Sequence, residues 1–238
     1  MLVIDSTSSM GWIHRYLRNH LSKMISDFQL EGRTIDFAVM GFRDTKCSKH
    51  PWLEFSGFTI SSWKPVDPAI AEEMENIARN SVFRGNSTSP EKALELLRSK
   101  GGGNNSAESS LFALRASLEV DWPADSRRKI IVLFTDEKPH IPDLLVPTWK
   151  SFNNEISNPD RLNKIDQIHL FITPDKQEYY EELTFSGIQI LFHNLTKDLN
   201  NLDRSFRNFV QSSSEWDEDD DDEIIYGDWS EGENPFDD

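Results

Sequence analysis

Short apolar runs that alternate with helical patterns constrain the fold of this chain more than any other feature. Residues 129–135 (KIIVLFT) form the clearest run, and the absence of polar alternation within it indicates a strand buried on both faces. Comparable runs occupy residues 34–42, 167–173 and 188–192. Strands that alternate with helices predict an α/β fold with a doubly wound, mostly parallel sheet flanked by helices on both faces.

Helical patterns fill the chain between these runs. We expect helices at residues 10–28, 69–78, 90–99, 107–118, 148–156, 177–183 and 199–210. A weaker apolar run at residues 53–60 is predicted to be the one short antiparallel strand, at an edge of the sheet.

Charge is distributed unevenly along the chain. The 238 residues contain 41 acidic and 25 basic side chains, and 13 of the acids lie in residues 215–238, where no base occurs. The remaining 28 acids and 25 bases make the body of the chain nearly neutral. This balance lacks the basic footprint of a nucleic-acid-binding domain, so no direct binding to nucleic acid is expected.

The acidic end predicts a boundary between a domain at residues 1–211 and a disordered tail at residues 212–238, because such a tail has too little apolar surface to bury. Two interpretations of the tail stay open, a solubilising segment and a segment that folds on a basic protein partner. The second is favoured by apolar residues embedded in the charge, which are Ile224, Ile225, Tyr226, Trp229 and Phe236.

Composition also bears on the compartment. Cys47 is the single cysteine, which excludes an internal disulfide and is typical of a reducing environment. No apolar run has the length of a membrane span, and the chain opens in an apparent strand rather than a secretory signal. A cytoplasmic location without membrane attachment is therefore expected.

The first strand leads directly into a set of oxygen-bearing side chains. The apolar residues 2–4 are followed by Asp5, Thr7 and Ser9. Ligands of open parallel sheets bind beyond the carboxyl ends of the strands, where these three side chains would lie together. Carboxylate and hydroxyl oxygens suit Mg²⁺, with Mn²⁺ or Ca²⁺ as substitutes. The competing interpretation is purely structural, with Asp5 as a capping acid and Ser9 as a helix N-cap.

Two later loops extend this pattern. A glycine run at 101–103 precedes Asn104, and Asp136 follows the strand at 129–135. Together with the Asp5-x-Thr7-x-Ser9 sequence, these loops resemble a von Willebrand factor A domain, a Rossmann-like fold, with its metal-ion-dependent adhesion site. Two further features are similar to the intracellular and bacterial branch of that family: the Phe42-Arg43-Asp44 sequence and Trp122.

The resemblance implies a metal site formed by Asp5, Thr7, Ser9, Asn104 and Asp136. Asn104 departs from the family pattern, which has Thr or Asp at that position. The alternative interpretation is that Asn104 is a turn residue beside the glycines and does not bind the metal. Asp5 and Asp136 would neutralise a divalent cation, and Mg²⁺ would keep an open coordination position for an outside oxygen. A segment at residues 61–89 stands as an insertion relative to compact members of the family.

These features imply a protein-interaction module rather than an enzyme. In the family such domains are adaptors within multi-protein systems, and the partner would supply an Asp or Glu carboxylate to the metal. The alternative is a Mg²⁺-dependent phosphotransferase or hydrolase with Asp5 as nucleophile. That class normally has a second Asp two residues later, and this chain has Thr7 at that position.

Overall fold

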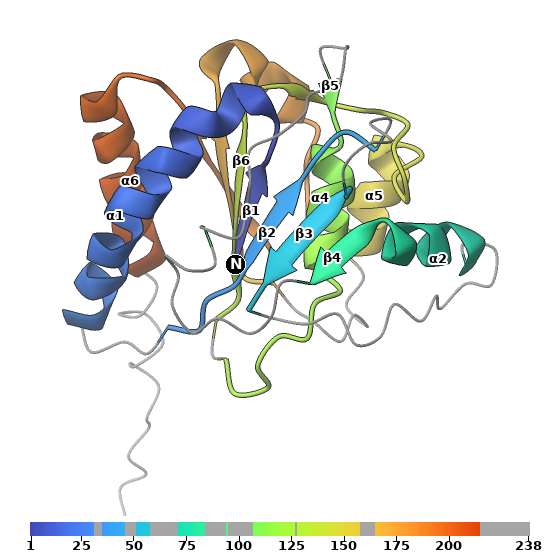
Figure 1. Ribbon diagram of the computed structural model, residues 1–238, viewed down its shortest axis with the longest axis horizontal. Helices are drawn as coiled ribbons and strands as arrows, with labels where there is room; N and C mark the ends of the chain where they lie inside the picture. The colour runs from blue at the N-terminus through green and yellow to red at the C-terminus, as the bar shows by residue number, and fades with distance from the viewer. Residues whose placement is uncertain are drawn as a thin grey trace, which may run out of the picture.

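The computed structural model describes residues 1–30, 35–45, 51–57, 71–83, 94, 107–126, 128–157 and 165–214. Within these residues seven strands form one mostly parallel sheet (Figure 1). In their order across the sheet the strands are β4 (Ser81–Phe83), β3 (Leu53–Ser56), β2 (Val39–Phe42), β1 (Leu2–Asp5), β6 (Ile130–Thr135), β8 (Gln167–Ile172) and β9 (Gln189–Asn194). The predicted Rossmann-like α/β fold is confirmed.

The strand order places β1 at the centre of the sheet. From β1 the chain builds outward through β2, β3 and β4 on one side, and then returns to add β6, β8 and β9 on the other. The pairs of β1 with β2 and with β6 are both parallel, with Ile4 opposite Gly41 and Phe134. The carboxyl ends of β1 and β6 therefore lie side by side where the direction of winding reverses.

Alternation along β1 divides the core into two layers. Leu2 and Ile4 point to the face covered by α1 (Gly11–Leu30) and α6 (Leu199–Ser214), whereas Val3 points to the opposite face. That second face packs against α4 (Ser110–Ser117) and α5 (Trp149–Ile156) (Figure 1). A strand buried on both faces must be apolar at successive positions, which explains the uninterrupted runs in the sequence.

The sheet contains the one antiparallel pairing that was predicted, and a further strand lies outside it. β3 is antiparallel to β2 as expected, but β4 pairs in parallel outside it. β4 follows α2 (Ala71–Arg79), and both lie within residues 61–89, the segment predicted as an insertion. Part of that segment thus extends the sheet.

Several predicted boundaries were wrong. The helix expected from residue 107 begins at Ser110, because Ala107 and Glu108 form a short strand, β5, that pairs with β7 (Lys138–Pro139). The helix expected at 177–183 is a 3-10 helix, η3 (Pro174–Tyr180). Another 3-10 turn, η1 (Ser8–Met10), precedes α1. α6 continues to Ser214, past the predicted helix end at residue 210.

Some predictions fall outside the described residues. They concern Cys47, most of the helix at residues 90–99, the glycine run with Asn104, and the acidic tail from residue 215. Among the helices in the described part of the chain, none combines the length and apolar character needed to cross a membrane.

Candidate functional site

The candidate site lies at the carboxyl ends of β1 and β6. The segment after β1 turns into α1 on one face of the sheet, and the segment after β6 leads to α5 on the other face. In doubly wound sheets, the place where loops from adjacent strands diverge to opposite faces is the usual ligand position. Asp5 ends β1, and Asp136 directly follows β6.

Asp5 is fully buried and held by local hydrogen bonds. The Thr7 N–H donates to Asp5 Oδ1 at 2.8 Å, and the Thr135 hydroxyl donates to Asp5 Oδ2 at 3.5 Å. The ring of His14, which is buried in α1, lies 2.9 Å from the Asp5 carbonyl oxygen. Contacts from the turn after β1, from β6 and from α1 thus fix the position of Asp5.

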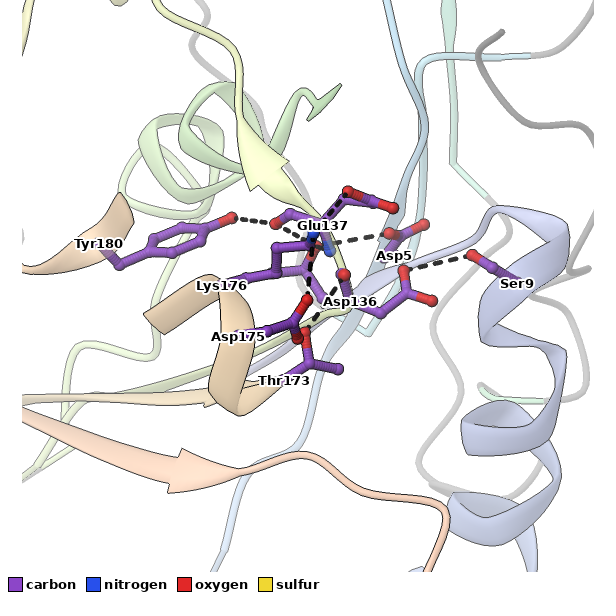
Figure 2. A network of polar contacts seen from close by, with 9 residues as sticks. Asp5, Ser9, Asp136, Glu137, Thr173, Asp175, Lys176 and Tyr180 are labelled. Atoms are coloured by element: carbon purple, nitrogen blue, oxygen red, sulfur yellow. Dashed lines mark hydrogen bonds and ion pairs between the residues drawn. The ribbon is translucent and has the colours of Figure 1, made fainter. Parts of the chain in front are cut away.

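A chain of hydroxyl groups connects this loop to Asp136. The Thr7 and Ser9 hydroxyls lie 3.1 Å apart. Ser9 donates to Asp136 Oδ1 at 3.2 Å, a contact drawn in Figure 2. Thr173, at the end of β8, donates to the Asp136 carbonyl oxygen at 3.3 Å. Four of the five predicted ligands, Asp5, Thr7, Ser9 and Asp136, are therefore brought together.

Burial makes the two carboxylates costly to ionise together. It raises the pKa of Asp5 to about 7, and the negative charge of Asp136 contributes to the increase. Burial also raises the pKa of Asp136, against opposing contributions from the Ser9 hydrogen bond and from the positive charges of Lys197 and Lys176. A bound cation would stabilise both carboxylates in their charged form.

The residues after Asp136 are anchored by η3. The Tyr180 hydroxyl, fully buried, donates to the Glu137 carbonyl oxygen at 3.0 Å and lies 2.7 Å from the Ser110 hydroxyl. Lys176 Nζ lies 4.0 Å from Glu137 Oε2 and 3.2 Å from the Asp175 carboxylate, as Figure 2 shows. Packing between η3 and the loop thus restrains the backbone that carries Asp136.

The Phe42-Arg43-Asp44 sequence has a clear structural role. Arg43 and Glu54 are both buried, and their side chains form an ion pair at 3.1 Å between the end of β2 and β3. Asp44, also buried, lies 3.4 Å from the ring of His140. These contacts join the antiparallel edge to the loop that follows β7.

Sequence reasoning missed one acidic residue at this edge of the sheet. Glu108 on β5 is buried, and burial raises its pKa to about 9, with contributions from the charges of Asp5, Asp44, Asp136 and Glu137. The sequence places Glu108 inside an apparent helical pattern, and only its pairing with β7 brings it to the site. Nothing in the local sequence pattern signals that position.

The donor set fits a hard cation only if the hydroxyl groups take part. In the described segments no three His, Cys, Asp or Glu side chains are grouped as ligands for a metal ion. The predicted set instead combines two carboxylates with the Thr7 and Ser9 hydroxyls, a composition of oxygen donors that suits Mg²⁺ with retained water. Asn104, the fifth predicted ligand, lies outside the described residues.

Comparison with known proteins provides no family assignment. No family model matches this chain, and no curated protein matches it. The resemblance to von Willebrand factor A domains therefore stays a prediction that depends on the motif residues.

Proposed function

We propose that this protein is a metal-dependent protein-interaction module of the von Willebrand factor A type. Asp5, Thr7, Ser9 and Asp136, with Asn104, would hold Mg²⁺, or Mn²⁺ or Ca²⁺ in its place. A partner protein would complete the coordination with an Asp or Glu carboxylate. The module would serve as an adaptor in a cytoplasmic multi-protein system, without a catalytic step of its own.

The observation that carries this proposal is the hydroxyl chain from Thr7 through Ser9 to Asp136. It joins loops from two strands at the crevice where doubly wound sheets bind ligands. The raised pKa values of Asp5 and Asp136 give a second support, because two buried carboxylates close together are stabilised by a cation.

The burial of Asp5 favours binding over the phosphotransferase alternative. Asp5 has no exposed surface, and both of its carboxylate oxygens accept hydrogen bonds from the protein. A nucleophilic carboxylate must be accessible to an incoming phosphoryl group. A carboxylate that binds a cation can be buried, because the other sides of the cation stay open to ligands. Turnover of a generic phosphate ester with Mg²⁺, abolished in Asp5→Asn, would instead support the enzyme.

Partner capture with and without chelator tests the proposal. Tagged wild-type protein is expected to retain specific partners from native cells in Mg²⁺ and to release them in EDTA. Asp136→Ala should fail to retain the same partners while it keeps a cooperative thermal unfolding transition. Retention of the same partners by wild type in EDTA, and by Asp136→Ala in Mg²⁺, would show that docking does not use the metal.

Deletion of residues 215–238 tests the tail separately. If the tail binds a basic partner, its removal should eliminate partners whose retention depends on ionic strength and leave thermal stability unchanged. An unchanged set of partners would leave the tail as a solubilising segment.

A further inference from the structure

Glu108 is a buried acid whose side chain lacks full hydrogen bonding. Only 4% of its surface is exposed, and within the described residues its Oε2 atom has no hydrogen-bond partner. Buried polar atoms are nearly always paired, and a carboxylate without a partner is especially costly. An unpaired oxygen at this position therefore calls for a ligand.

The backbone holds Glu108 at the edge of the candidate site. β5 pairs with β7, two residues after Asp136, and the Glu108 carbonyl oxygen accepts the His140 N–H at 3.0 Å. In Figure 1, β5 lies beyond the carboxyl end of the main sheet, where the loops after β1 and β6 also lie. Pairing between two segments distant in the chain thus sets the position of Glu108.

The surroundings of Glu108 are strongly negative. Asp5, Asp44, Asp136 and Glu137 all lie close enough for their charges to disfavour its ionised form. Two neighbouring cations already have carboxylate partners in the described part of the chain, because Arg43 pairs with Glu54 and Lys176 lies between Asp175 and Glu137. A group of acids with an unpaired buried oxygen fits a bound cation better than it fits a purely structural cluster.

We propose that Glu108 is a further residue of the cation site, a third carboxylate that holds the divalent ion through its hydration shell. This inference rests on the proposed metal site formed by Asp5 and Asp136. It deepens that proposal by adding an outer carboxylate, which would increase affinity for the cation. A third carboxylate adds negative charge that would repel the acidic residue of a partner. The positive charge of Lys197, which acts on Asp136, offsets this repulsion.

Titration of the full chain with MgCl₂, followed by calorimetry and thermal unfolding, tests the role of Glu108. Glu108→Gln is expected to weaken Mg²⁺ binding by about tenfold or more, the usual effect of losing an outer-shell partner. In EDTA the same variant should unfold at a higher temperature than wild type, because the substitution removes a buried acid from a negative environment. A structural carboxylate would show the opposite change in stability.

Control variants separate this inference from the proposed function. Glu178→Gln removes an equal charge from an exposed position on η3 and should bind Mg²⁺ as wild type does. If Asp136→Asn loses Mg²⁺ binding while Glu108→Gln retains it, the role of Glu108 is wrong and the metal site stands. If wild type itself does not bind Mg²⁺, both proposals are overturned.

Discussion

The Ser9 hydroxyl donates a hydrogen bond to Asp136 Oδ1 at 3.2 Å, although the two residues are 127 positions apart in the chain. This contact links the turn after β1 to the turn after β6, across the point where the winding of the sheet reverses. Both side chains bear oxygen and neither is fully buried, so the contact lies where an outside ligand can reach it.

Replacement of Ser9 by alanine tests this link. Ser9 is exposed, so Ser9→Ala should change the free energy of unfolding in EDTA by no more than about 0.5 kcal/mol. Mg²⁺ affinity should fall by about tenfold or more, because a ligand oxygen and the support of Asp136 are lost together. Calorimetric titration measures the change, and Ser8→Ala is the control. Equal Mg²⁺ affinity in the two variants would exclude Ser9 as a ligand.

Loss of one partner of the Arg43–Glu54 ion pair should destabilise the protein more than replacement of both partners by apolar residues. Arg43→Met removes one partner of a buried ion pair and should destabilise the protein by about 3–5 kcal/mol, since it leaves the buried Glu54 carboxylate without the positive charge of Arg43. The double variant Arg43→Met with Glu54→Leu should recover most of that loss. Urea denaturation measures both. A double variant as unstable as the sum of the single variants would contradict this expectation.

A pair of buried histidines should make the protein sensitive to acid. His169 Nδ1 lies 2.9 Å from His193 Nε2, and burial lowers the pKa of His169 to about 3 and that of His193 to about 4. Between those values and 6.5 the unfolded chain binds protons that the folded chain does not. Stability should therefore fall as pH decreases through this window.

Substitution of His193 tests that origin of the pH dependence. In His193→Phe the loss of stability between pH 6.5 and pH 4 should be smaller than in wild type by up to about 3 kcal/mol. Urea denaturation at several pH values measures it, with the exposed His20→Gln as the control. A wild-type slope in His193→Phe would place the acid sensitivity elsewhere.

Asp143 should make the stability of the protein depend on pH in the opposite direction. Burial raises the pKa of Asp143 to about 7, so between about pH 4 and pH 7 the folded chain keeps a proton that the unfolded chain has released. Stability should then decrease as pH rises through this window. Asp143→Asn should unfold at a higher temperature than wild type at pH 8, and the amide oxygen can still accept the Leu144 N–H. Equal unfolding temperatures of Asp143→Asn and wild type at pH 8 would contradict this prediction.

The sequence alone determined which strands are buried and where the chemistry lies along the chain. Strand β6 is apolar at successive positions because helices cover both faces of the sheet, and this burial pattern is a local property of the sequence. Asp5 and Asp136 stand directly at or after strand ends, so a parallel sheet was enough to predict that they share one edge.

Only the tertiary structure decided which side chains meet at that edge. Glu108 looks helical in sequence, and its position depends on pairing between β5 and β7, which are about thirty residues apart. The position of β4 likewise depends on its parallel pairing with β3. Such contacts are stabilised by burial between distant segments, and no local propensity or spacing encodes them.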